Sequence, residues 1–264
     1  MAPRKSADDR NVDGTQAIRR AAAMLRRIGQ GAQGVGMGEI VDALQLPRST
    51  SHRILKCLVD EGLVEHDQEN RRYRIGRLTY ELGLTVTKDP LEIAQWRSAV
   101  DRVAQRTGAT AYLMRRSGAE AVCVLKTDGT SVIRVIPVDV GQRRLLGAGA
   151  GSTALLAALD EETSERLINS ISVSAHGYPQ LKEATIRRIV DEARRTGFAV
   201  SQSNVVDGAI GIGMAVSRSD GTPYLALSIA ALAAQANERL IEEWKQIIRQ
   251  EIAAVLAAQK RPSV

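Results

Sequence analysis

Residues 47–56 read PRSTSHRILK, and this stretch decides how the first third of the chain is interpreted. It sets four side chains that can carry positive charge among three hydroxyls, with only two apolar residues. On a helix, one face would be apolar and buried, made of Ser51, Leu55, Leu58 and Val59. The opposite face would be polar, made of Ser49, His52, Arg53, Lys56 and Asp60. Such a face suits either a solvated helix or a surface that contacts DNA phosphates and base edges.

The segments before and after this helix favour the DNA-binding interpretation. Residues 15–29 have apolar side chains at helical spacing, and the glycines of residues 29–36 end that first helix. A short second helix follows, and Pro47 suits the first turn of the third. Residues 63–66 and 72–75 then read as two short strands around a polar turn. The apolar face expected on the first helix is Ile18, Ala21, Ala22, Leu25 and Ile28, and on the second Met37, Ile40, Val41 and Leu44.

Three helices followed by a basic hairpin predict a winged helix-turn-helix. Arginine side chains can pair with guanine edges or phosphates, and hydroxyls can bind either. The residues expected to contact DNA are Arg48, Ser49, Thr50, His52, Arg53 and Lys56 on the third helix, and Arg71, Arg72 and Arg74 in the hairpin.

The distribution of charge agrees with a polyanionic partner. The chain of 264 residues has 36 Lys and Arg against 30 Asp and Glu, and residues 1–77 hold 14 of the basic and 10 of the acidic side chains. Four of the six excess positive charges therefore lie in the first third. Aromatic residues make up only 3% of the chain, whereas proteins that stack unpaired bases need more. Duplex DNA read through a groove is therefore the favoured partner.

The chain resembles the IclR family of bacterial transcriptional regulators. The resemblance is carried by EIVDALQLPRSTSHRILKCLVDEGLVEHDQENRRYRIG (residues 39–76) and continues through RLTYELGL (residues 77–84). It is looser in GAGAGSTALLAAL (residues 147–159) and RRTGFAVSQSNVVDGAIGIGMAV (residues 194–216). It implies a homodimeric or tetrameric regulator, on the pattern of a repressor, that binds an inverted-repeat operator and controls a catabolic operon. It also implies a GAF-like domain that binds a small-molecule effector, such as an organic or aromatic acid.

The second part of the chain predicts an antiparallel sheet flanked by helices. A linker helix is expected near residues 78–84, and a longer helix over residues 89–106 that buries Leu91, Ala94, Val100, Val103 and Ala104. Strands are expected in residues 109–116, 119–126, 131–139, 198–203, 209–217 and 223–231. Helices are expected over residues 151–159, 161–170, 180–196 and 236–258. The expected boundaries are a disordered arm (1–14), the winged helix-turn-helix (15–77), the linker helix (78–89), an α+β effector domain (90–258) and a tail (259–264).

The glycine-rich stretch GAGAGSTA could support three kinds of structure. Gly149, Gly151 and Ala154 match a permissive dinucleotide-binding pattern, but that fingerprint needs a preceding buried strand and an acidic residue about 20 positions on. The residues before this stretch are GQRRLL, which do not read as a buried strand, and the residue 19 positions after Gly151 is Ser170, which is not acidic. A turn before a packed helix and a small-molecule site remain open. A helix N-terminus favours an anionic group, and glycine allows close approach to the backbone.

By resemblance, the glycine-rich loop and two later strands border the effector pocket. The implied residues are Leu146, Gly147, Ala148, Gly149, Ala150, Gly151, Ile210, Gly211, Ser228 and Ala230. The family commonly has Cys where this chain has Gly211, and often Ser where it has Ala230. Both departures remove polar groups and volume, which favours an effector larger or more apolar than a short oxo-acid. Tyr112 and Met114 could line the same pocket, although their pattern favours core packing.

The remaining features place the protein in the cytoplasm as a regulator without catalysis. Cys57 and Cys123 read as two buried free thiols, and no metal-binding spacing occurs. The longest mostly apolar run has 11 residues, fewer than the roughly 18 that indicate a membrane span. No catalytic residue, metal or cofactor is predicted. The alternatives are a dinucleotide-binding enzyme with an accessory DNA-binding domain, and an architectural DNA-binding protein without a ligand.

Overall fold

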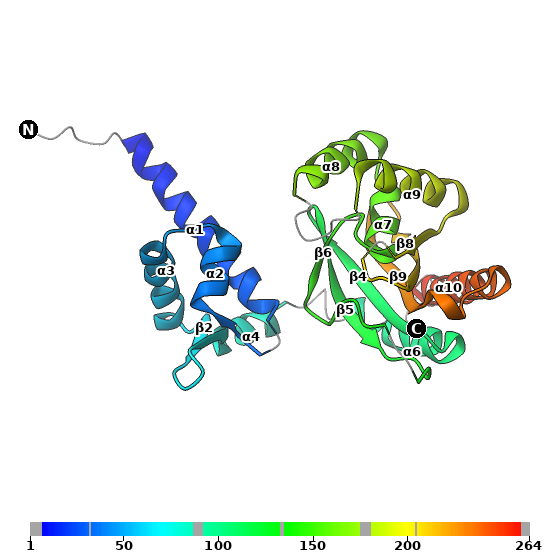
Figure 1. Ribbon diagram of the computed structural model, residues 1–264, viewed down its shortest axis with the longest axis horizontal. Coiled ribbons are helices and arrows are strands. Elements are labelled where there is room, and N and C mark those ends of the chain that lie inside the picture. Colours follow the sequence, from blue (N-terminus) through cyan, green and yellow to red (C-terminus); the bar gives the residue numbers. More distant parts are fainter. Residues whose placement is uncertain are drawn as a thin grey trace, which may run out of the picture. The chain divides into compact units, whose positions relative to one another are not determined.

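The computed structural model describes residues 7–31, 33–86, 92–132, 135–174, 181–203 and 205–259. The chain divides into two compact units, Met1–Lys88 and Asp89–Val264 (Figure 1). The first unit contains α1 (Ala7–Gly29), β1 (Val35–Gly36), α2 (Met37–Leu44), α3 (Arg48–Asp60), β2 (Val64–Asp67), β3 (Arg72–Ile75) and α4 (Arg77–Leu84). Its three strands pair antiparallel in the order β1-β3-β2. This is the predicted winged helix-turn-helix.

The core of the first unit follows from the apolar faces of its helices. Its buried side chains are Met24, Ile28, Val35, Ile40, Leu55, Leu58, Val64 and Tyr73. The turn between α2 and α3 begins at Gln45, whose φ of 51° is left-handed and reverses the chain. Pro47 caps α3 with an extended backbone, so it precedes the first helical residue and does not occupy it.

Two expectations about the first unit are corrected by the structure. The first helix begins at Ala7 and so extends into the segment predicted to be a disordered arm. Ile28 is buried as predicted and Ala21 and Leu25 pack against the core, but Met24 is buried as well and Ile18 is 72% exposed. The short strand β1 was not predicted, because two residues are too few to show a period.

The second unit is a six-stranded antiparallel sheet with helices on both faces. Its strands are β4 (Thr110–Ser117), β5 (Glu120–Thr127), β6 (Arg143–Leu145), β7 (Ala199–Gln202), β8 (Ala209–Ser217) and β9 (Pro223–Leu232). They are ordered β6-β5-β4-β9-β8-β7. Its helices are α6 (Arg97–Thr107), α7 (Ala150–Ala157), α8 (Glu161–Ser174), α9 (Glu183–Thr196), the short 3-10 helix η1 (Ala233–Gln235) and α10 (Glu238–Gln259).

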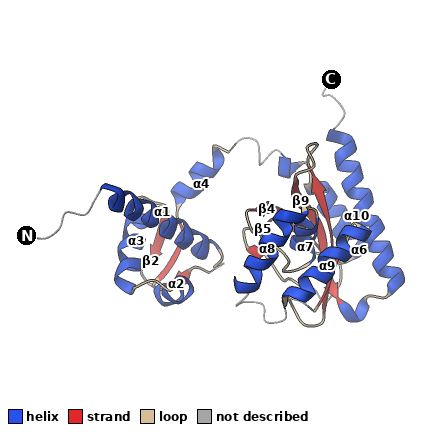
Figure 2. Ribbon diagram, turned by 90° about the horizontal axis from the view of Figure 1, so that it is seen from above, coloured by secondary structure: helices blue, strands red, loops and turns tan. Residues whose placement is uncertain are grey.

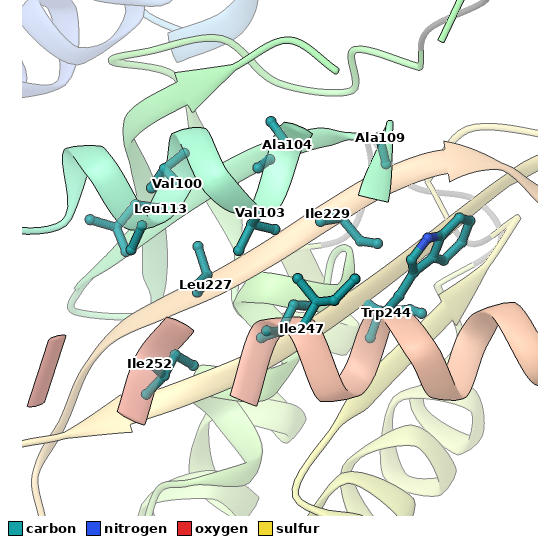
Figure 3. Close-up of a cluster of buried hydrophobic side chains, with 14 of the residues drawn as sticks. Val100, Val103, Ala104, Ala109, Leu113, Leu227, Ile229, Trp244, Ile247 and Ile252 are labelled. Carbon is teal, nitrogen blue, oxygen red and sulfur yellow. The ribbon is translucent and has the colours of Figure 1, made fainter. Parts of the chain in front are cut away.

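The sheet has a separate hydrophobic core on each face. Figure 2 shows α6 and α10 on one side of the sheet and α7 and α9 on the other. In the first core, Val103 of α6 and Ile247 of α10 pack against strand residues such as Leu227 (Figure 3). In the second core, α7 and α9 cover Tyr112, Met114 and Cys123.

The described residues differ from the sequence prediction in two places in the second unit. Within residues 131–139, the part that the structure describes forms no strand, and β6 supplies the partner of β5. The helix predicted over residues 89–106 is interrupted at Gln95 and Trp96, because Trp96 turns into the core. Ala94 is consequently exposed, while Val100, Val103 and Ala104 are buried as predicted. Leu91 lies outside the described residues.

In the part of the chain that the structure describes, no helix has both the length and the apolar character needed to span a bilayer. The same residues contain no cluster of three or more His, Cys, Asp or Glu side chains arranged to hold a metal ion.

Candidate DNA interface and effector pocket

The two faces of α3 have the burial that the sequence predicts. Ser51, Leu55 and Leu58 are buried against the core, and Val59 is half-buried. The opposite face is exposed along its length, at Ser49, His52, Arg53, Lys56 and Asp60. Arg48 is also exposed at the start of the helix, and Thr50 is half-buried. The second helix of the helix-turn-helix therefore presents a basic, hydroxyl-bearing surface to solvent.

Glu39 fixes the start of α2 and ties it to the neighbouring elements. Its carboxylate accepts a hydrogen bond from the backbone N–H of Gly36 at 2.8 Å. It also lies 3.5 Å from Arg27 of α1 and 3.6 Å from Arg72 of β3. These contacts hold the helix that precedes α3 against both α1 and the wing.

Among the predicted DNA contacts in the wing, Arg72 has a role within the fold. Its Nη1 donates a hydrogen bond to the carbonyl oxygen of Gly34 at 2.8 Å. Together with the Glu39 contact, this bond ties β3 to the residue before β1 and to α2. Arg71 and Arg74 are exposed.

The tip of the wing is ordered by Asp67. Its Oδ1 accepts hydrogen bonds from the backbone N–H groups of Glu69 and Asn70, and its Oδ2 accepts one from the Asn70 side chain. These bonds from Asn70 lower the pKa of the Asp67 carboxyl. Arg71 takes a left-handed φ of 52° at this turn. Asp67 also lies 4.0 Å from Arg74 Nη2, so it connects the turn to β3.

A cavity of about 580 Å³, counting the space at its mouth, lies in the second unit. Eight of the ten predicted effector residues line it: Ala148, Gly149, Ala150, Gly151, Ile210, Gly211, Ser228 and Ala230. Leu146 and Gly147 are buried but are not part of the lining. Tyr112 and Met114 line the cavity and also belong to the core, so both roles considered for them hold.

Close packing of α7 on the sheet explains the glycines around the cavity. A Cβ at Gly213 would lie 2.8 Å from the backbone of Ala150, and one at Gly151 would lie 2.8 Å from Ser228 Oγ. Gly149 precedes α7 with a φ of 93°, a conformation that side chains rarely adopt. A Cβ at Gly211 would lie 3.1 Å from the Cβ of Ala150. Ala150 of α7 therefore occupies part of the space that a larger side chain at position 211 would take.

The polar groups of the cavity are mainly hydroxyls. The Tyr112 hydroxyl donates to the carbonyl oxygen of Val135 at 3.3 Å, and burial raises the pKa of this phenol. Ser201 and Ser228 are 6% and 5% exposed. Neither hydroxyl has a hydrogen-bond partner within the described ranges. Both residues line the cavity, where a polar ligand can pair with their hydroxyls.

Several lining residues were not predicted from the sequence. They are Pro137, Val138, Arg144, Ser152, Ser201, Ser203, Val205, Val206, Ala209 and Ile229. Most belong to loops or to β6 and β7, which carry no pattern of their own. Ser201 is paired with Gly211 across β7 and β8, so the strand register could have indicated that Ser201 lines the cavity.

The geometry argues against the dinucleotide-binding alternative. All strand pairings among the described residues of the second unit are antiparallel. The residues that precede α7 form a three-residue edge strand followed by a turn. A dinucleotide site needs a buried parallel strand that feeds the helix.

Comparison with known proteins gives the same assignment for both units. Residues 88–256 match the family described as bacterial transcriptional regulator IclR C-terminal, and residues 17–68 match the IclR helix-turn-helix domain. The chain belongs to the IclR family of transcriptional regulators. It therefore combines a DNA-binding helix-turn-helix domain with an effector-binding C-terminal domain.

Relatives in the IclR family match along most of the chain. The glycerol operon regulatory protein of Streptomyces coelicolor is 26% identical over 252 residues, which cover 91% of this chain and 92% of that protein. The transcriptional repressor AllR of Salmonella paratyphi A is 26% identical over 239 residues, with coverage of 89% and 87%.

Solved structures confirm the fold. An IclR-type regulator from Alicyclobacillus acidocaldarius has a TM-score of 0.73 and 24% identity, and covers 92% of this chain and 98% of that one. An IclR homologue from Microbacterium hydrocarbonoxydans, in complex with 4-hydroxybenzoate, has a TM-score of 0.67 and 21% identity, with coverage of 90% and 97%.

Proposed function

We propose that this IclR-family protein is a repressor of a catabolic operon, and that a small organic acid bound in the cavity controls its affinity for DNA. The observation that carries this proposal is the joint presence of an exposed basic face on α3 and a cavity with unpartnered hydroxyls in the second unit. The relatives named as an operon regulator and as a repressor support it, and so does the homologue bound to 4-hydroxybenzoate. A protein of this kind needs no catalytic residue, cofactor or metal and would act on DNA in the cytoplasm.

The same proposal assigns the DNA contacts and the oligomer. Arg48, Arg53 and Lys56 would enter the major groove, and Arg71 and Arg74 would contact phosphates. A single winged helix buries too little surface for strong specificity, so two copies would read an inverted repeat. Exposed apolar side chains on α1 and α4, such as Ile18, Tyr80 (68% exposed) and Leu84 (65% exposed), support a dimer formed through these helices.

Titrating operator binding with candidate acids tests the proposal. Fluorescence anisotropy would follow the wild-type protein on DNA from upstream of its own and neighbouring genes, with and without each compound. A ligand can shift the equilibrium only if it prefers one conformer. We expect one acid to change operator affinity at least tenfold. If operator binding is strong and no pathway acid changes it, the protein is a regulator without a ligand.

A pocket variant shows whether the cavity is responsible. Ala230 lines the cavity and is nearly buried, so Ala230→Leu would occupy ligand space. The acid concentration at half-response should rise by an order of magnitude or more. Operator binding without acid reports on the DNA-binding unit, and the thermal melt reports on the fold. A folded Ala230→Leu protein with the wild-type response would place the effector elsewhere.

A further inference from the structure

Glu39 lies at the junction of the helix-turn-helix and the wing. It is the third residue of α2, and its Oε2 accepts the hydrogen bond from Gly36, the residue before that helix. The same Oε2 lies 3.6 Å from Arg72 Nη1, and Oε1 lies 3.5 Å from Arg27 Nη2. One carboxylate therefore links the start of α2 to β3 and to α1.

The contact with Arg72 is made at the end of the hairpin nearest its turn. Arg72 is the first residue of β3 and is paired with Asp67, the last residue of β2, so the turn at residues 68–71 begins and ends beside this pair. Val64 and Tyr73 are buried in the core of the first unit. Every side chain between these two residues is polar, and none is buried. Arg72 therefore attaches the turn of the wing to α2.

The backbone beside Arg72 permits this attachment. Gly34 has a φ of 82°, and a Cβ there would lie 3.0 Å from Arg74 Cγ and 3.2 Å from Arg72 Cβ. Glycine thus lets the chain pass close to β3, where the Gly34 carbonyl oxygen accepts the bond from Arg72. β1 pairs with β3 over two residues, and the second of them, Gly36, is also the cap of α2. The position of the wing relative to α2 consequently depends on a few polar contacts, including those of Glu39.

The position of the wing matters because α3 and the wing must contact the same duplex. Ile40 of α2 and Leu55 of α3 share one core, so the position of α2 also fixes that of α3. A wing that moves freely relative to these helices has to be ordered when DNA binds, and this ordering reduces the affinity. Ion pairs at the surface contribute little to stability. Geometry therefore accounts for the Glu39 contacts better than stability does.

We propose that Glu39 is a positioning residue for DNA binding, which acts through Arg72 to hold the turn of the wing where it meets the duplex bound by α3. Glu39 itself does not contact DNA. Its negative charge opposes the approach of phosphates, so its benefit comes from the placement of the wing. This inference rests on the proposed contacts of the wing with phosphates.

Glu39→Gln tests the proposal. The substitution keeps the shape of the side chain and an oxygen that can accept the Gly36 bond, but it removes the charge that Arg27 and Arg72 face. Fluorescence anisotropy measures the binding of the full chain to upstream DNA that the wild type protects, and to a random-sequence duplex of the same length. Both affinities should fall by about threefold to tenfold, because contacts with phosphates are made in every sequence.

Two further readouts distinguish a misplaced wing from a damaged fold. The preference for upstream DNA over the random duplex should stay within about twofold of the wild-type value, and the slope of log K against log salt should become shallower by about one phosphate contact. Titration with excess DNA counts the active protein, and a thermal melt reports on the fold. Partial unfolding therefore cannot be mistaken for weaker binding.

Glu69→Gln is the matched control. Glu69 is exposed in the turn of the wing, and its side chain has no hydrogen bond or ion pair with another described residue. The substitution removes the same charge as Glu39→Gln. Since loss of a negative charge near DNA favours binding, this variant should bind both duplexes as tightly as the wild type or more tightly. Opposite effects of Glu39→Gln and Glu69→Gln would separate positioning from charge.

A double-mutant cycle shows whether Glu39 acts through Arg72. Arg72→Gln alone should weaken binding to both duplexes. If the wing is already released in that variant, adding Glu39→Gln should reduce the affinity by less than about twofold more.

Three results would overturn the positioning role. They are affinity in Glu39→Gln equal to or above that of the wild type, a loss of preference for upstream DNA along with the affinity, and losses that multiply in the Arg72→Gln background. A wild type that binds both duplexes equally would instead contradict the proposed function, and the random duplex would still test Glu39. A wild type that binds neither duplex would contradict both.

Discussion

Arg53 lies exposed in the middle of α3, between His52 and the helix turn that carries Lys56. Arg53→Ala should weaken operator binding by about 1–3 kcal/mol and relax the preference at one base pair. The melting temperature should barely change, because exposed substitutions usually alter stability by less than about 0.5 kcal/mol. Anisotropy with single-base operator variants measures the first effect, and a thermal melt measures the second.

Arg72 provides the contrasting variant for this experiment. Arg72→Ala removes the hydrogen bond to Gly34 and the contact with Glu39. It should therefore lower the free energy of unfolding by about 0.5–1.5 kcal/mol. If Arg53→Ala binds the operator as tightly as the wild type, α3 does not contact the DNA as proposed, and the result for Arg72→Ala does not change that conclusion.

The two cysteines should differ in reactivity, contrary to the expectation that both are buried. Cys57 is exposed on α3, whereas Cys123 is buried beneath α7. Burial raises the pKa of the Cys123 thiol to about 12, so it stays protonated at pH 8, where an ordinary thiol with a pKa of about 8.5 begins to ionise. Ellman's reagent at pH 8 should modify one thiol per chain in the native protein and two in guanidinium. Two reactive thiols in the native protein would mean that the core beneath α7 opens readily.

The close packing of α7 on β8 depends on Gly213. At Gly213 a Cβ would meet backbone atoms of Ala150 and Gly151 at 2.8–2.9 Å, and backbone cannot rotate away. Gly213→Ala should therefore lift the start of α7 and destabilise the protein by about 1–3 kcal/mol. At Gly211 the nearest atom is the Ala150 Cβ at 3.1 Å, so Gly211→Ala should cost less. Chemical denaturation of both variants checks this order, and equal losses would show that α7 shifts freely.

Most helices and strands could be predicted because their apolar patterns are long enough to show a period. The exposed and buried faces of α3, for example, follow directly from the spacing of Leu55 and Leu58. The strand predicted over residues 131–139 fails for a reason outside that segment. The open edge of β5 is taken by Arg143–Leu145 and by hydrogen bonds from Cys123 to Gln142 and from Gly141 to Cys123.

The same reasoning explains which parts of the cavity were missed. The glycine-rich loop was found by resemblance, and it does form the wall at α7. Arg144 was missed because β6 has three residues and shows no alternation. Ser201 and Ser228 could be brought together only by the sheet order, which no local pattern specifies.

For the intact protein, the proposed dimer predicts a symmetric footprint. Protection should cover an inverted repeat whose half-sites lie one or two helical turns apart. Affinity should fall steeply with salt, since each phosphate contact contributes a slope of about −0.9 in log K against log salt. Leu84→Glu, on the exposed surface of α4, should shift the protein towards monomer in sedimentation and weaken operator binding. Tight binding of one half-site by a monomer would contradict the dimer.

The two cores of the six-stranded sheet also bear on how such a regulator diversifies. Most residues that line the cavity lie on the α7 face, although Ile210 and Ile229 also belong to the opposite core, which α6 and α10 bury with large side chains such as Trp244 and Ile248. Substitutions at lining residues of the α7 face therefore leave the core under α6 and α10 intact. In a library randomised at Ala230, Met114 and Arg144, we expect many more folded variants than in one randomised at Leu227, Ile247 and Ile252.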